Sequence, residues 1–251
     1  MVFFFLQENI PSEHKDDGLS DAQHTALLAD LESLNGTKRI TDGVIQRIFA
    51  IFSTTTFRNE EILLLRESVT SMSNMDAIAR LPLLDFSLVF IPLKIAEMRP
   101  YSDAGVHLSL LVLHNRKKGT HKFLHYDIIG SANRAVAESL AESIRKVIPA
   151  FAKVVIYEPP MPQQQDPYNC GVYVLTITEV IYEWCMKNEE LTHELRDRVK
   201  ELGEVHNMRT KYHQMIRNHE AVRDPAILNT TELENTSAEK HCLRDIHANS
   251  V

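Results

Sequence analysis

Residues 162–184 constrain the fold more than any other part of the chain, because a run rich in proline and glutamine leads into a long apolar stretch. In that stretch Val172, Leu175 and Ile181 recur close to the spacing of an α-helix. Its many β-branched residues are also compatible with a strand. We expect a helix that begins near Cys170 and is buried on most of its sides.

Cys170 occupies the first turn of this expected helix, where the helix dipole and the free backbone N–H groups favour a thiolate. The residue is therefore a candidate nucleophile. A single cysteine ahead of an apolar helix is more often a small buried hydrophobe, so its position alone favours a structural role.

The composition is that of a globular protein and argues against several functional classes. The 251 residues carry a net charge of −7 without a long run of lysine or arginine, which argues against a nucleic-acid-binding surface. The three cysteines (Cys170, Cys185 and Cys242) include no pair at metal or redox spacing, so we expect no metal, no cofactor and no disulfide framework. The apolar run at residues 2–6 is too short for a signal segment or a membrane span. We therefore expect an intracellular protein of the cytoplasm, the nucleus or both.

We expect one folded domain with an appendage at each end. The N-terminal extension comprises residues 1–19, the domain residues 20–226, and a polar, flexible tail residues 227–251.

The pattern of apolar residues and turn signals predicts the order of helices and strands. The predicted helices lie at residues 20–34, 41–52, 60–72, 133–148, 189–203 and 210–222. The predicted strands lie at residues 87–91, 106–113, 121–128 and 152–157. Ser20 and Gln23 form a capping box at the first helix, and Pro92 is expected to close the first strand. The second and third strands are joined by so short a loop that they should form an antiparallel hairpin. Helices and strands are partly segregated, which favours an α+β fold.

A thiol nucleophile needs a base, and the base needs a third group that fixes its orientation. In the predicted hairpin, His107 lies at the entry end of one strand and Asp127 near the exit end of its neighbour, so their side chains could meet. His125 lies two residues from Asp127 on the same face and is the strongest competitor. The other candidates are Asp103 in a loop, and His114 and His121 at the turn end of the hairpin.

These residues together resemble a known family. The order His107, Asp127, Gln164, Cys170-Gly171, within the segments HLSLLVL, HYD and QQQDPYNCGVYV, is similar to that of the Ulp, or sentrin-specific, cysteine proteases. That family acts on ubiquitin-like modifiers, and the chain is most similar to the branch that acts on the NEDD-type modifier. The resemblance is specific over residues 87–184 and looser over residues 39–86.

The resemblance implies a papain-like α+β fold, in which a central helix led by the nucleophile packs on a small, mostly antiparallel sheet. It implies that Cys170 is the nucleophile, that His107 is its base and that Asp127 orients the imidazole. Gln164, rather than its neighbours Gln163 and Gln165, would donate its amide to the oxyanion beside the backbone N–H of Cys170.

The implied reaction is hydrolysis of the peptide or isopeptide bond after the C-terminal Gly-Gly of a ubiquitin-like modifier. The modifier would be of the NEDD or SUMO type, met as a precursor or as a conjugate. We expect a monomer with neither a nucleic-acid nor a membrane partner.

Several positions near the implied site depart from the family pattern or are ambiguous. Leu108 stands where the family has a tryptophan that roofs the tunnel for the Gly-Gly tail, which implies a looser tunnel. Asn169 replaces an aspartate before the nucleophile, and Arg39 replaces a tryptophan. Asp42 aligns with an acidic position near the modifier-binding helix, but also fits a residue that stabilises a helix start.

These departures leave a second hypothesis, a modifier-binding module of the same fold with weak or no turnover. Retention of His107, Asp127, Gln164 and Cys170 favours the protease. A third hypothesis is acyl transfer, since related folds pass the thioester to another acceptor, but no coenzyme site is indicated.

Overall fold

A five-stranded sheet forms the centre of the computed structural model, which describes residues 19–57, 61–65, 80–95, 107–117, 120–161, 163–164, 166–187 and 205–223. The strands are β1 Ile62–Leu64, β2 Leu88–Ile95, β3 His107–Lys117, β4 Thr120–Tyr126 and β5 Ile156–Tyr157. The α-helices are α1 Asp21–Ser33, α2 Asp42–Ile51, α4 Arg134–Val147, α5 Cys170–Lys187 and α7 Val205–Arg223. Shorter helical turns occupy Phe52–Thr56, Leu83–Asp85 and Pro149–Phe151.

The strands lie side by side in the order β1-β2-β3-β4-β5. β2, β3 and β4 are antiparallel, whereas β1 is parallel to β2 and β5 is parallel to β4. The predicted hairpin and the mostly antiparallel sheet are therefore confirmed. Leu110 pairs with Tyr126, which puts the start of β3 beside the end of β4. His107 and Asp127 consequently lie at the same end of the sheet.

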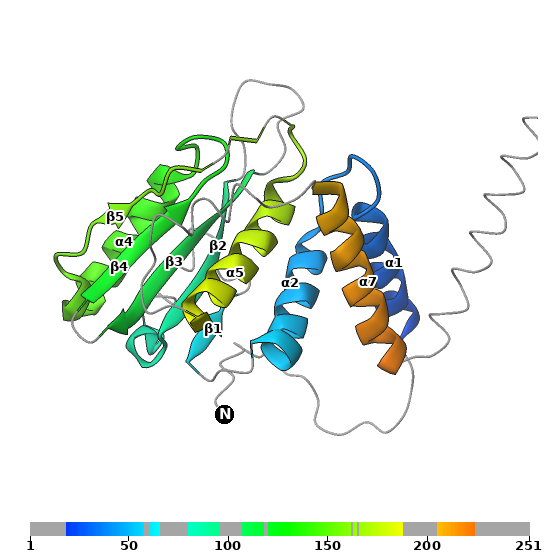
Figure 1. Ribbon diagram of the computed structural model, residues 1–251, viewed down its shortest axis with the longest axis horizontal. Coiled ribbons are helices and arrows are strands. Elements are labelled where there is room, and N and C mark those ends of the chain that lie inside the picture. The colour runs from blue at the N-terminus through cyan, green and yellow to red at the C-terminus, as the bar shows by residue number, and fades with distance from the viewer. Residues whose placement is uncertain are drawn as a thin grey trace, which may run out of the picture.

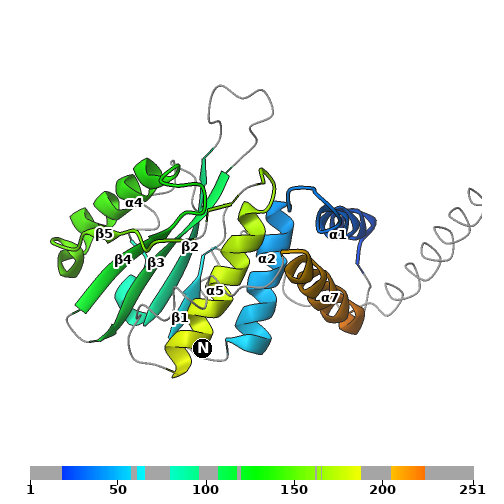
Figure 2. The same cartoon turned by 45° about the horizontal axis from the view of Figure 1, so that its top comes forward.

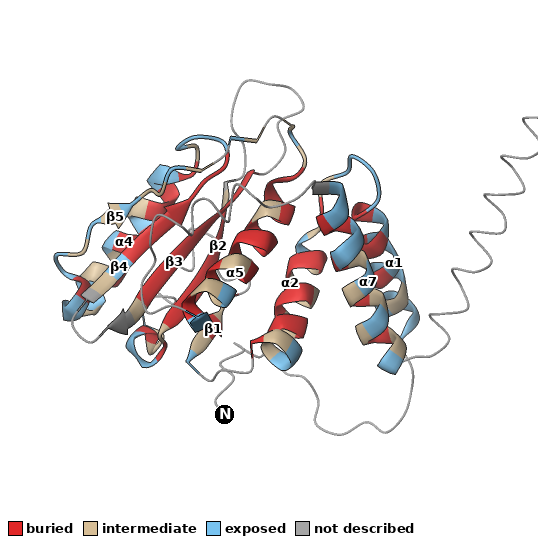
Figure 3. Cartoon of the chain, in the orientation of Figure 1, coloured by how far each residue is buried: buried red, intermediate tan, exposed pale blue. Residues whose placement is uncertain are grey.

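Helices cover both faces of the sheet (Figures 1 and 2). Helices packed on a mostly antiparallel sheet confirm the predicted α+β class. α5 crosses one face with α2 beside it, and α7 and α1 pack outside α2. Because side chains alternate along a strand, Leu110 and Val112 of β3 face α5, whereas Leu111 and Leu113 face α4 on the other side. Figure 3 shows the resulting pattern of burial, with the sheet and α5 mostly buried and the outer sides of α1 and α7 exposed to solvent.

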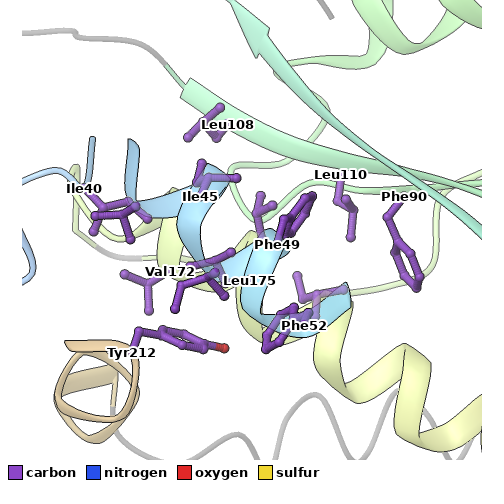
Figure 4. Close-up of a cluster of buried hydrophobic side chains, with 14 of the residues drawn as sticks. Ile40, Ile45, Phe49, Phe52, Phe90, Leu108, Leu110, Val172, Leu175 and Tyr212 are labelled. Carbon is purple, nitrogen blue, oxygen red and sulfur yellow. The ribbon is translucent and has the colours of Figure 1, made fainter. Parts of the chain in front are cut away.

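The predicted buried helix is α5, and it begins at Cys170. Figure 4 shows Val172 and Leu175 of α5 surrounded by side chains of α2, the sheet and α7, among them Tyr212. Both α5 residues are fully buried. Burial of a side chain of this size stabilises the fold by about 1.5–3 kcal/mol. The helix that carries Cys170 is therefore held from three directions.

Two predicted helix starts are also confirmed. Ser20 accepts a hydrogen bond from the backbone N–H of Gln23, and the Gln23 side chain accepts one in return from the backbone N–H of Ser20, so both bonds of the capping box form. Thr41 caps α2 by accepting a bond from the backbone N–H of Val44 at 3.3 Å. The Thr41 cap fixes the start of α2, which lies next to the candidate site.

The helix predicted at residues 60–72 is wrong where the structure describes it, because residues 62–64 form strand β1. An apolar run this short fits a helix or a strand, and parallel pairing with β2 decides for the strand. Residues 66–72 and the helix predicted at 189–203 lie outside the described residues, as do residues 1–18 and the tail at 227–251.

Pro92 does not close the first strand as predicted, because β2 continues through it to Ile95. Pairing with β1 stops at Phe90, so at Pro92 only the β3 side of β2 has a described neighbour. Leu88 and Phe90 direct their backbone groups toward the β1 side, and Pro92 has the same orientation, so its missing N–H removes no bond to β3. β5 is shorter than the predicted strand at 152–157, because residues 152–153 form a turn. In the described part of the chain, no helix combines the length and apolarity needed to cross a membrane.

Candidate active site

His107 and Asp127 meet at the end of the β3–β4 hairpin, as the sequence predicted. His107 Nε2 lies 2.7 Å from Asp127 Oδ1, and both side chains are buried. The other ring nitrogen, Nδ1, remains for the thiol. The contact follows from the antiparallel register, which brings the first residue of β3 beside the residue that follows β4.

The Asp127 carboxylate is fixed by the start of the chain segment that leads into α4. Its Oδ1 accepts a hydrogen bond from the backbone N–H of Ile129 at 2.9 Å, and its Oδ2 accepts one from the backbone N–H of Asn133 at 2.8 Å. Burial by itself would raise the pKa of Asp127, but the bonds from His107, Asn133 and Ile129 lower it below its ordinary value. The carboxylate is therefore held in its ionised form.

Cys170 completes the group, because it interacts with His107 from the start of α5. Burial by itself would lower the pKa of His107, but the bond to Asp127 and the charges of Asp127 and Cys170 outweigh it and raise the pKa to about 9. At neutral pH the imidazole is consequently protonated. Nδ1 has no hydrogen-bond partner among the described residues. A protonated imidazole between a thiol and a carboxylate is the arrangement of an activated cysteine nucleophile.

The competing histidines have other partners. His125 is fully buried, and its ring nitrogens lie 3.0 Å from Ser109 Oγ and 3.0 Å from Glu158 Oε1. His121 Nδ1 lies 3.0 Å from Asn115 Oδ1 near the turn of the hairpin. His114 pairs with Lys122 in the same register, away from Asp127. Asp103 lies outside the described residues.

Gln164 lies close to the site, but its amide is directed elsewhere in this state. Its backbone N–H donates to the Ile128 carbonyl at 2.8 Å, which joins its segment to the end of β4. Its side-chain Nε2 donates to the carbonyl oxygen of Asp166 and, at 3.0 Å, to Asp166 Oδ1. The Oε1 atom is buried and has no hydrogen-bond partner among the described residues. Gln163 is exposed and accepts a bond from the backbone N–H of Gly130, whereas Gln165 lies outside the described residues.

A pocket beside Cys170 is lined by Arg39 and Leu108, which depart from the family pattern, and by Asp42, which fits either a modifier contact or a helix start. The pocket has a volume of about 230 Å³. It is lined by Arg39, Ile40, Asp42, Lys94, Leu108, Tyr168, Cys170 and Gly171. Asp42 Oδ2 pairs with Lys94 Nζ at 2.7 Å, and the exposed fraction of the Asp42 side chain is 54%. Leu108 and Asp42 are therefore placed where a substrate tail could contact them.

Asn169 is placed differently, because it lies behind the nucleophile and does not line the pocket. It is 6% exposed, and both ends of its amide are used by protein partners, Asp166 and Arg209. Sequence patterns did not indicate Arg209 or Asn133, whose side chains reach the site from distant segments. Asn133 donates from Nδ2 to Ser109 Oγ at 2.9 Å and to the His107 carbonyl at 3.3 Å.

The chain has relatives among characterised proteins. It is 29% identical over 174 residues to the NEDD8-specific protease 1 of Arabidopsis thaliana, which covers 64% of this chain and 75% of that protein. It is 28% identical over 164 residues to the sentrin-specific protease 8 of Homo sapiens, with coverage of 61% and 75%.

Solved structures share the fold. A de-sumoylating protease superimposes with a TM-score of 0.54 at 14% identity, covering 84% of this chain and 90% of that one. The SUMO protease Ulp1, with its catalytic cysteine oxidised to a sulfinic acid, gives a TM-score of 0.51 at 14% identity over 76% of this chain and 83% of that one. These likenesses confirm the predicted papain-like arrangement of sheet and central helix.

The family described as the Ulp1 protease family, C-terminal catalytic domain, matches residues 55–221. This match spans more than half of the chain and includes the hairpin, Gln164 and Cys170. It confirms the resemblance drawn from those residues. The chain therefore belongs to the Ulp1 protease family and is a cysteine-type peptidase.

Proposed function

We propose that this peptidase cleaves the peptide or isopeptide bond after the C-terminal Gly-Gly of a ubiquitin-like modifier of the NEDD8 or SUMO type. The observation that carries the proposal is the buried pair of His107 and Asp127, which meets Cys170 at the start of α5 beside a pocket. The names of the relatives, which include a NEDD8-specific and a SUMO protease, support the same substrate class. We assign the catalytic domain to residues 20–226.

In the proposed reaction Cys170 and His107 start as a thiolate and an imidazolium, and the proton given up by the thiol is on Nδ1 because Nε2 is held by Asp127. The thiolate attacks the carbonyl carbon of the last glycine, and the protonated imidazole then gives its proton to the leaving amine. Water hydrolyses the resulting thioester and releases the modifier. Asp127 keeps the ring oriented and stabilises its charge throughout.

Two N–H donors are proposed for the oxyanion. The backbone N–H of Cys170 is one of the first in α5, and such groups have no partner within their own helix. The Gln164 amide would be the second, after it leaves Asp166 and turns toward the substrate. One donor of this kind lowers the barrier by about 3–4 kcal/mol.

Ile40 and Leu108 pack closely against the backbone of α5 where they line the pocket. A Cβ atom on Gly171 would lie 2.6 Å from Ile40 Cγ1 and 3.3 Å from Leu108 Cδ1, so these two side chains already close over the backbone of α5. A tail passing between them toward Cys170 has little room for side chains. We propose that Leu108 contacts the Gly-Gly segment and that Asp42, with Lys94, contacts residues preceding it.

Fluorogenic modifiers test this function directly. NEDD8, SUMO and ubiquitin, each with a C-terminal fluorogenic amide, are incubated with the protein and with a Cys170→Ala variant, and binding is measured in parallel. Hydrolysis of NEDD8 or SUMO that is lost in the variant supports the protease. Binding of a modifier without hydrolysis, equal in both proteins, would replace it with the alternative of a binding module. The observation that favours the binding module is the Gln164 amide, which donates to Asp166 and not toward the position of an oxyanion.

A further inference from the structure

The side-chain carboxylate of Asp166 holds the segment that leads into Cys170. Its Oδ1 accepts hydrogen bonds from the backbone N–H groups of Tyr168 at 3.0 Å and Asn169 at 2.9 Å. Its Oδ2 accepts a bond from Asn169 Nδ2 at 2.8 Å. The same carboxylate binds the Gln164 amide. Asp166 therefore joins the expected oxyanion donor to the backbone that leads into the nucleophile.

Arg209 of α7 holds this segment from behind. Its side chain is buried, and Nε donates to Asn169 Oδ1 at 2.8 Å. Its other nitrogens donate to the carbonyl oxygens of Ser33 at 3.1 Å, Lys38 at 2.6 Å and Tyr168 at 3.4 Å. One guanidinium thus connects α7, the end of α1 and the segment before Cys170, a task that suits its fixed fork of donors.

Asn169 lies between these two charges, and only an amide satisfies both. Its Nδ2 faces the carboxylate of Asp166, and its Oδ1 faces the guanidinium of Arg209. An aspartate at position 169 would still suit Arg209, but it would set two carboxylates 2.8 Å apart at the Asp166 contact. An asparagine at position 166 together with an aspartate at 169 would satisfy all the same contacts.

We propose that Asp166, Asn169 and Arg209 form a positioning network that sets Cys170 for the reaction and holds the Gln164 amide near it until substrate binds, and that positions 166 and 169 must share one carboxylate and one amide. The network acts through Cys170 and does not touch the substrate. The inference rests on the proposed function for the role of Gln164. The constraint on positions 166 and 169 rests on the contacts alone.

The proposal also accounts for the asparagine in front of the nucleophile. The negative charge that the family pattern places at position 169 is supplied in this chain by Asp166. Burial lowers the pKa of Arg209, and the charge of Asp166 opposes that shift, so the carboxylate is a counter-charge for the buried guanidinium. The replacement therefore moves a charge and does not remove it.

A charge-exchange experiment tests the network with Asn169→Asp, Asp166→Asn and the double variant. Two rates are measured at pH 7: kcat and KM on whichever fluorogenic modifier the wild type hydrolyses, and alkylation of Cys170 by iodoacetamide, followed by mass spectrometry of its peptide. We expect each single variant to lose at least about tenfold in kcat and in alkylation, with KM within about twofold of wild type. The double variant should recover both rates to within about threefold of wild type.

Glu220→Gln is the matched control. Glu220 lies on α7 and is as buried as Arg209 of that helix, but it pairs with Arg47, away from the site. This variant should lower the unfolding midpoint and leave kcat unchanged. Wild-type kcat in Asn169→Asp, or a double variant no faster than the slower single variant, would overturn the proposal. If a single variant fails to fold, a folded and active double variant supports the pairing and an unfolded one refutes it. If the wild type hydrolyses no modifier, the proposed function fails, while the alkylation rates still decide for or against the network.

Discussion

The charge on Asp127 should control the pH range in which Cys170 is reactive, and Asp127→Asn removes that charge with little change of shape. Asp127 accepts bonds from His107, from the backbone N–H of Ile129 and from that of Asn133, so both of its oxygens face donors. An asparagine has one oxygen and one NH₂ group, which must point at one of these donors. The variant therefore loses the charge and cannot satisfy every contact.

The size of the effect follows from the pKa of His107, which is about 9. An opposite charge in contact shifts a pKa by about 1–3 units, so loss of the carboxylate should bring the pKa of His107 toward about 7. At pH 8 the protonated fraction then falls from about nine-tenths to about one-tenth. The loss of ring orientation adds to this tenfold effect, and we expect kcat/KM at pH 8 to fall at least about 100-fold.

The assay is the pH profile of kcat/KM from pH 5.5 to 10, with Cys170 alkylation measured beside it. The wild-type profile should fall on its alkaline side near pH 9, and that of Asp127→Asn about two units lower. Glu158→Gln is the matched control, since Glu158 also pairs with a histidine, His125, on the same sheet. It should leave kcat/KM within about twofold of wild type. An unchanged alkaline limb in Asp127→Asn, or equal losses in the two variants, would refute the reasoning.

Three further predictions follow from the described contacts. Because the pKa of His107 is higher in the folded protein than in the unfolded chain, protonated His107 stabilises the fold fully below about pH 6.5, and this contribution is lost as the pH rises through about 9. Denaturant titrations should show the free energy of unfolding falling by about 3 kcal/mol over that range in the wild type. His107→Gln should show no such fall. Leu108→Trp should narrow the pocket, so the preference for a Gly-Gly over an Ala-Gly tail, measured as a ratio of kcat/KM, should rise at least about tenfold; an unchanged ratio would place the tail elsewhere. Gly171→Ala should displace Ile40 and lower kcat/KM at least about tenfold, while unfolding free energy changes by less than about 1 kcal/mol because alanine favours the helix; a fully active variant would contradict the assigned tail path.

Local patterns were enough to predict the central elements of the fold. The apolar run after Cys170 and the short loop of the β3–β4 hairpin are encoded in neighbouring residues, and the structure has both. The contact of His107 with Asp127 followed from the hairpin, because antiparallel pairing fixes which ends meet. Family resemblance was needed only to assign roles to these residues.

Other features depend on contacts between distant segments, which one sequence does not show. Residues 62–64 form a strand because β2 lies beside them, and Pro92 is compatible with β2 because the N–H that it lacks would face away from β3. His125 lies near Asp127 in sequence, but Glu158 and Ser109 occupy both of its ring nitrogens. Arg209 is 40 residues from its partner Asn169, and no local pattern marks it as part of the site.

The central claim is that Cys170, activated by His107, accepts the C-terminus of a ubiquitin-like modifier. The most direct measurement is the reaction of the purified protein with NEDD8, SUMO and ubiquitin that carry a C-terminal electrophile, followed by mass spectrometry of the digested adduct. We predict one adduct, with NEDD8 or SUMO, attached at the peptide that contains Cys170, absent in Cys170→Ala and formed at least about 100-fold more slowly in His107→Gln. Attachment at Cys185, or equal labelling in wild type and Cys170→Ala, would contradict the account.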